Sequence, residues 1–432
     1  MSGDAGMEGV RHRTFLRLWA IGAFGSTGRW LDTLVYALLV VEVGGGALDV
    51  TTLMLVRTLP LALFGWLVGR LAEHVAPRTA LTAGAGIAAA VAIAVAALAF
   101  AGTPTVFALS CAAFAGGLVW AADLPVRRVL IGEVVGPEHT GRAMSLDTVA
   151  GSATRAVGPL LGGLLYAHAG APGALAASAV LHLVAMCLAL GVSVPGGTGQ
   201  SEGTMRGTAR PATHAKSGAG RRENALQPLA APLAVIRGSI LAPVFVLTVL
   251  FNLFAYPIIS LLPLLGATLY ELTPAQVGLL VSVEGMASAV AALLLVVAVR
   301  PAAARQVFTC AAVIYVLGGL ILANVQSALP AALAVAVMGS ALAAFAAMQS
   351  ALVLANAPAG QARRMMGVLS ICIGTGPLGY LALGALAEVV GTTRACAISA
   401  AIALVALVLI ALRWPGLMAR QPAAPTTEAR MA

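Results

Sequence analysis

Long apolar stretches separated by short polar turns recur along the whole chain of 432 residues. A helix of about 20 residues, rising 1.5 Å per residue, crosses a hydrocarbon core about 30 Å thick. Because the stretches are too long for barrel strands, helices are the expected spanning structure. The pattern predicts about twelve transmembrane helices, at residues 15–41, 50–71, 79–100, 105–125, 145–168, 172–192, 241–264, 275–298, 305–325, 330–355, 366–388 and 393–412.

Composition strengthens this prediction. Hydrophobic residues make up 60% of the chain and charged residues only 9%, and the mean hydropathy is +0.96, whereas a soluble domain has about 25% charged residues. The first apolar run lacks a small-residue cleavage site, so we expect it to be retained as a helix. The cysteines stand singly without metal-ligand spacing, so we expect no metal site.

One long polar stretch divides the chain. Residues 193–238 are rich in Gly, Ser, Thr, Pro and Arg, which is typical of a flexible linker. We therefore predict an all-α membrane protein with two pseudo-symmetric six-helix bundles. The expected boundaries are 1–192 and 239–415 for the bundles, 193–238 for a cytoplasmic linker and 416–432 for a cytoplasmic tail.

The distribution of basic residues supports an orientation. The chain carries 25 Lys and Arg and a net charge of +9. With the N-terminus inside, all of them except Arg29, Arg57, Arg155 and Arg394 fall in segments expected to be cytoplasmic. This is the asymmetry of the positive-inside rule, and it places both termini in the cytoplasm. The positive charge is therefore explained by topology and lipid contact, and we expect no nucleic-acid partner.

Both halves carry a glycine-proline motif in their fifth predicted helix. The first half has Gly158, Pro159, Gly162 and Gly163, and the second has Gly376 and Pro377. Proline removes a helical hydrogen bond and glycine removes side-chain bulk, so these motifs predict a hinge or a close helix contact. Packing alone would also explain them. Corresponding interruptions in two halves are a pointer to transporter architecture.

Two segments carry a family resemblance. Residues 69–78, GRLAEHVAPR, resemble the loop signature of the major facilitator superfamily, with Glu73 in place of Asp and His74 in place of Arg. Residues 125–163 resemble the bacterial exporter branch that includes siderophore and macrolide efflux proteins. The resemblance implies a secondary transporter in the bacterial inner membrane, and its glycine-proline motif is associated with export. It also implies that the loop after the second helix is a conformational latch.

The expected latch lies at the cytoplasmic ends of the helices. Gly69 permits close helix approach, Glu73 can pair with arginines of the facing helices, and Asp123 is spaced for an i,i+4 contact with Arg127. The alternative is that these residues are solvated anchors. The candidates are Gly69, Glu73, Arg78, Asp123, Arg127, Arg128 and Arg142.

Five ionisable residues inside predicted spans stand out, namely Arg29, Asp32, Arg57, Arg155 and Glu284. Each costs about 2.5–3.5 kcal/mol on insertion scales, so each needs a partner or a role. Asp32 and Arg57 lie at similar depth and can form an ion pair, for which Arg29 competes from one turn away. Either a proton-coupling role or a purely structural cluster fits these three residues.

Glu284 and Arg155 both lie near the membrane midplane. In the superfamily their two helices meet at the boundary between halves, so we expect a central pair that opens when Glu284 is protonated or substrate binds. The alternative is that Glu284 faces a water-filled cavity and binds a cationic substrate.

Aromatic and amide side chains at other positions suit an amphipathic organic substrate. The cavity candidates are Trp30, Trp120, Asn252, Tyr256 and Gln349, although the two tryptophans equally suit a lipid-facing position.

Nothing in the sequence indicates an enzyme or a cofactor. The phosphate-binding GxxxxGK[ST] loop is absent, and the histidines have no paired-ligand spacing. We therefore expect a monomeric, proton-coupled exporter of a small organic compound such as a drug, a siderophore or a secondary metabolite. The alternatives are an importer or exchanger of a small metabolite, and a non-transporting receptor or assembly factor on the same fold.

Overall fold

The computed structural model describes residues 2–72, 75–136, 139–192, 239–298, 301–358 and 361–418. The predicted linker at 193–238, Glu73 and residues 419–432 of the predicted tail lie outside this part of the chain.

The first half consists of long helices. They are α1 (Ser2–Glu42), α2 (Ala47–Ala72), α3 (Pro77–Phe100), α4 (Val106–Val135) and α5 (Thr140–Leu190). The last of these has non-helical backbone at Gly170, where φ is 66°. Glycine adopts positive φ without steric cost, and Pro172 follows directly, so α5 turns there and crosses the molecule twice.

The second half contains the more irregular helices. Its first crossing runs through α7 (Leu241–Leu250), a π-helical turn (Phe251–Ala255), a 3-10 segment (Tyr256–Leu261) and α8 (Leu262–Thr268). Then come α9 (Pro274–Ala298), α10 (Ala304–Asn324) and α11 (Ala328–Asn356). The fifth crossing is divided into α12 (Ala362–Ile373) and α13 (Gly376–Val390), and α14 (Thr392–Arg413) is the last.

The predicted helical membrane architecture is confirmed. Within the described residues, nine segments are long and apolar enough to cross a membrane, and one of them, Leu146–Leu190, contains the Gly170 turn. Counting that segment twice and adding α1 and α2 to the nine gives twelve crossings. Most helix ends lie within a few residues of the predicted spans.

Two helices extend further than the apolar pattern predicted. Helix α1 begins at Ser2, and α4 continues to Val135. In α4 the residues Val126, Leu130 and Val134 recur at helical spacing and are buried, and this packing favours the helix beyond Pro125. Arg127 and Arg128 therefore lie on a helix and not in a loop.

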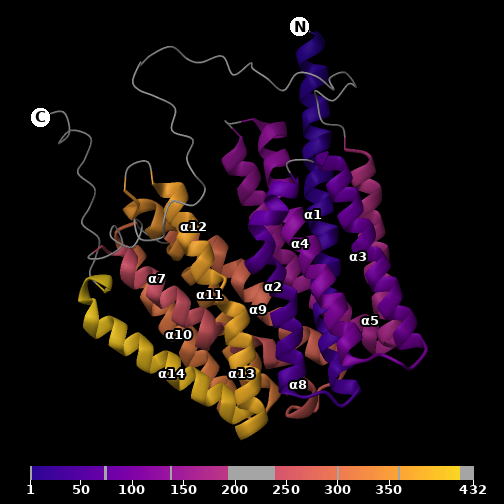
Figure 1. The fold of residues 1–432 in the computed structure, drawn as a ribbon. Helices are drawn as coiled ribbons and strands as arrows, with labels where there is room; N and C mark the ends of the chain where they lie inside the picture. The colour runs from indigo at the N-terminus through magenta and orange to yellow at the C-terminus, as the bar shows by residue number, and fades with distance from the viewer. Residues whose placement is uncertain are drawn as a thin grey trace, which may run out of the picture.

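The two halves pack together through a few helix pairs (Figure 1). Helix α5 lies along α9, α2 lies along α13, and α1 contacts α8. At the α5–α9 contact, a Cβ atom on Gly163 would lie 2.8 Å from the Cα atom of Gly278, so only glycine permits this approach. At the end of α13, Glu388 Oε1 accepts a hydrogen bond from the backbone N–H of Leu48, 3.4 Å away at the start of α2.

Basic residues gather at the other end of the bundle, which we call the arginine-rich end. There, Arg17 of α1 donates to the carbonyl of Gly191, and Arg305 of α10 donates to the carbonyl of Gly416 at 3.4 Å. The described arginines of this end are Arg13, Arg17, Arg78, Arg305, Arg364 and Arg413.

Candidate functional site

An ion pair joins the two halves at the α5–α9 contact. Arg155 Nη1 lies 3.3 Å from Glu284 Oε1, and the two side chains are 24% and 10% exposed. The backbones approach closely here, because a Cβ atom on Gly285 would lie 2.6 Å from the backbone nitrogen of Ala156. The glycine places the two helices so that the charged side chains meet, as expected from their depth.

Trp30 supports the arginine of this pair. The Arg155 guanidinium lies 5.9 Å from the centre of the Trp30 ring, which is within the range of a cation–π interaction. Trp30 and Arg155 are both half-buried. Arg29 and Trp120 form a second such pair at 5.7 Å. Both predicted tryptophans therefore lie against arginines.

The remaining cavity candidates belong to the packing of the second half. Asn252 donates to the Thr248 carbonyl at 2.9 Å, and Gln349 donates to the Thr248 hydroxyl at 2.8 Å. Both amides are buried. Tyr256 is half-buried and its ring centre lies 6.5 Å from that of Tyr380. Of these three side chains, Tyr256 is the one with exposed surface beside the interface.

Asp32 has a different partner from the one predicted. Its Oδ2 lies 3.2 Å from His182 Nε2 on the second crossing of α5. Arg57 instead donates to the backbone carbonyl of Arg29 at 2.9 Å, and Arg29 donates to the Ser26 hydroxyl at 2.5 Å. Both arginines interact electrostatically with Asp32, but its direct partner is His182 and not, as predicted, Arg57 or Arg29.

The reason is the packing of His182. Its imidazole lies against Gly28, where a Cβ atom would be 2.9 Å from the ring nitrogen. Gly28 is one helical turn from Asp32, so the ring reaches that carboxylate first. His182 is not among the predicted site residues, although a histidine in the middle of an apolar span was a signal.

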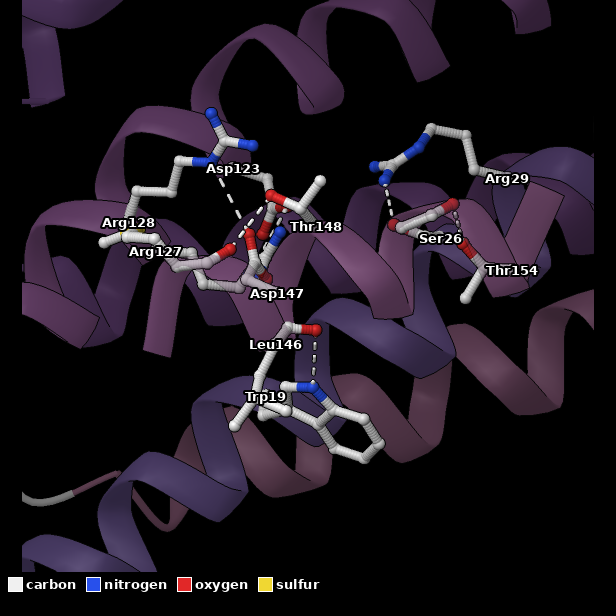
Figure 2. Close-up of polar contacts among 12 residues, drawn as sticks. Trp19, Ser26, Arg29, Asp123, Arg127, Arg128, Leu146, Asp147, Thr148 and Thr154 are labelled. Carbon is white, nitrogen blue, oxygen red and sulfur yellow. Dashed lines mark hydrogen bonds and ion pairs between the residues drawn. The ribbon is translucent and has the colours of Figure 1, made fainter. Parts of the chain in front are cut away.

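A charged cluster lies toward the arginine-rich end of the first half (Figure 2). Asp147 lies between Arg127, to which it is ion-paired, and Arg128, whose Nε is 3.5 Å from Asp147 Oδ2. Arg127 Nε also lies 3.6 Å from Asp123 Oδ2, one turn away on α4. Trp19 donates to the Leu146 carbonyl beside it at 3.4 Å.

The other predicted latch residues are only partly described. Glu73 and the side chain of Arg142 lie outside the described part of the chain, Gly69 lies within α2, and Arg78 is exposed. The carboxylate shared by Arg127 and Arg128 is that of Asp147, and the predicted contact of Asp123 with Arg127 is also present.

The glycine-proline motif of the first half makes close helix contacts. Helix α5 continues through Pro159. A Cβ atom on Gly158 would lie 2.5 Å from Trp30 Cβ, and one on Gly162 would lie 3.2 Å from Leu31 Cγ. Gly163 meets Gly278 of the other half. These glycines are therefore contact positions against α1 and α9.

In the second half the corresponding motif follows a break in the helix. Helix α12 ends at Ile373, and Gly376 and Pro377 begin α13. A Cβ atom on Gly379 would lie 2.5 Å from the carbonyl oxygen of Asn252, in the π-helical turn of the first crossing. The fifth crossing thus packs against the first crossing in both halves.

Comparisons with known proteins identify the fold. A family model described as "Transmembrane secretion effector" (MFS_3) matches residues 5–198. No curated protein matches the chain. The nucleoside transporter NupG has a similar structure, with a TM-score of 0.69 and 14% identity over 94% of this chain and 99% of that one. The chain has the major facilitator fold.

Other proteins with the major facilitator fold are equally similar. A bacterial homolog of the human lysosomal transporter Spinster, in an inward-facing and occupied conformation, gives a TM-score of 0.69 at 12% identity over 95% of this chain and 98% of that one. The POT family transporter PepTSo gives 0.68 at 14% identity over 94% and 98%. In the major facilitator fold of this chain, the ion pair of Arg155 and Glu284 lies between the two halves.

Proposed function

We propose that the protein is a secondary active transporter that exports a small organic compound in exchange for protons. The observation that carries this proposal is the ion pair of Arg155 and Glu284, which joins α5 of one half to α9 of the other. In alternating access, two halves rock against each other around a central site. A charged pair across their contact couples the protonation of one group to that movement.

The chemistry of the pair explains the coupling. When Glu284 takes a proton on its carboxylate, the attraction to Arg155 is lost and the α5–α9 contact weakens. Arg155 then presents an unpaired guanidinium beside Trp30 and Tyr256. An organic substrate with an aromatic group and an acceptor oxygen satisfies that guanidinium and stacks on the exposed rings. Release of the substrate and the proton restores the pair.

The proposal also includes the direction of transport and the orientation of the protein in the membrane. The description "Transmembrane secretion effector" of the matching family model supports export. By the positive-inside rule the arginine-rich end faces the cytoplasm, so both termini are cytoplasmic. We assign the protein to the bacterial inner membrane as a monomeric antiporter in the exporter branch. Its substrate class is a drug, a siderophore or another secondary metabolite.

Proteoliposomes test this function. Under an imposed pH gradient, wild-type protein is expected to drive net flux of at least one compound from a panel of antibiotics, siderophores and nucleosides. Glu284→Gln should lose gradient-driven flux but keep substrate exchange, which needs no net proton movement. Glu42→Gln is the matched control, because Glu42 pairs with Tyr166 within the first half. Gradient-driven flux that is equal in Glu284→Gln and wild type would reject the coupling, and no gradient-dependent flux in any compound would reject transport.

A further inference from the structure

A small cavity lies inside the first half, away from the contact between halves. Its volume is about 40 Å³, and every residue that lines it belongs to α1, α3, α4 or the second crossing of α5. Small residues such as Gly25, Gly84 and Ala88 form most of its wall. Three ionisable side chains also line it, namely Arg29, Asp123 and His182. An apolar bundle has no packing reason to enclose three such groups.

The cavity connects two polar clusters. Asp123 belongs to the cluster with Arg127 toward the arginine-rich end, and His182 is paired with Asp32. Along α1 the cavity extends from Ile21 to Arg29, which corresponds to about 12 Å of helix at 1.5 Å per residue. The cavity thus lies between a partly exposed cluster and a buried pair.

The buried charges around this cavity balance. Arg29, Arg57 and Arg127 face the carboxylates of Asp32, Asp123 and Asp147, and Arg128 is 48% exposed. Tyr36 also lies near Asp32, while α3 contributes only Ala, Leu and Gly to the wall. His182 is therefore the titratable group beyond these three arginines and three carboxylates, and its protonation changes the net charge of the region by one.

A buried polar atom without a partner in the described part of the chain lies on Asp32, the residue paired with His182 of the cavity wall. Among the described residues, Asp32 Oδ1 is buried and has no hydrogen-bond partner, although Oδ2 of the same carboxylate contacts His182. A cavity needs about 10–15 Å³ and two or more polar partners to hold a water molecule. The cavity exceeds that volume, and Arg29, Asp123 and His182 supply the partners.

We propose that this cavity is a hydrated proton-access chamber and that the pair of His182 and Asp32 is a second proton-binding site, separate from Glu284. The imidazole takes a proton from chamber water to form imidazolium, its other N–H remains donated to Asp32, and the same proton returns to water on release. The chamber supplies this proton from the arginine-rich end. The assignment of the proton to transport rests on the proposed function, whereas the binding of the proton does not.

Histidine-selective NMR of the full-length protein in lipid nanodiscs tests the site directly. The His182 signal is assigned from its absence in His182→Gln. In wild type we expect this signal to change with pH as the imidazole gains and loses its proton. Gly25→Val should abolish this response to pH or displace it along the pH axis, because a Cβ atom on Gly25 meets nothing within 4 Å and the side chain fills the chamber.

Two further variants serve as the control and the alternative for Gly25→Val. Gly116→Val on α4 also enters open space but does not line the chamber, so His182 should titrate there as in wild type. If Gly25→Val fails to fold, Gly84→Ala narrows the chamber, because its added Cβ makes an ordinary contact at 3.5 Å with Val119. A wild-type signal that does not change with pH, or titration unchanged in the chamber variants, would overturn the proposal. Titration in a protein that shows no substrate flux would retain this site and reject the transport function instead.

Discussion

The ion pair between the halves permits a quantitative prediction. Removal of one partner from a fully buried pair costs about 3–5 kcal/mol. The pair of Arg155 and Glu284 is weaker, because the arginine is 24% exposed and the 3.3 Å distance is longer than the about 2.7–2.9 Å of a strong charge-assisted bond. We therefore expect Glu284→Gln to lower the free energy of unfolding by about 1–3 kcal/mol. Arg155→Gln should cost a similar amount.

The double variant isolates the interaction. If the two side chains act as a pair, the loss in Glu284→Gln with Arg155→Gln should be smaller than the sum of the single losses, with an interaction energy of about 0.5–3 kcal/mol. Reversible unfolding in mixed micelles measures all four proteins, and Glu42→Gln is the control for loss of a carboxylate elsewhere. Single losses that add within about 0.5 kcal/mol would refute the pairing, whatever the effect on transport.

Three further predictions concern helix contacts. Gly163→Ala should force α5 and α9 apart and lower thermal stability, because its Cβ would lie 2.5 Å from the Pro274 carbonyl oxygen. An unchanged melting temperature would contradict this contact. Glu388→Gln should weaken the contact between α13 and the start of α2 by less than about 1 kcal/mol. The weaker contact should make a cysteine placed there react faster with a thiol label. An equal increase of the labelling rate in Glu42→Gln would count against this prediction. Asp147→Asn should lower the free energy of unfolding by about 3 kcal/mol, because it leaves the buried guanidinium of Arg127 with only the longer contact to Asp123. A loss below about 1 kcal/mol would refute this prediction.

Helix number and helix ends could be predicted because they depend on local hydropathy. A run of apolar residues must cross the membrane as a helix, whatever its neighbours are. The extension of α4 has a tertiary cause instead. Helix α4 continues past Pro125 because Val126, Leu130 and Val134 pack inside the first half, and this packing depends on tertiary contacts that hydropathy does not report.

Pairing of the buried charges was predicted less well. Counting residues gives the depth of a side chain but not the direction in which it points around the helix axis. Arg155 and Glu284 could be anticipated once the resemblance named the two helices that meet. Asp32 and Arg57 share a depth, yet His182 packs against Gly28 and reaches Asp32. For Arg127, the nearby carboxylate of Asp147 comes from a helix whose rotation the sequence did not reveal.

The irregular backbone of the second half has a mechanical consequence. The π-helical turn at Phe251–Ala255 and the break between α12 and α13 lie in two different crossings, yet Gly379 brings them into contact. Stiffness along a helix depends on its uninterrupted ladder of hydrogen bonds, and here two adjacent ladders are disturbed at one level. In the first half, α5 remains helical through Pro159, although this proline donates no hydrogen bond. The second half can therefore bend at the level of these two disturbed ladders, which allows one of its ends to open while its other end stays in place.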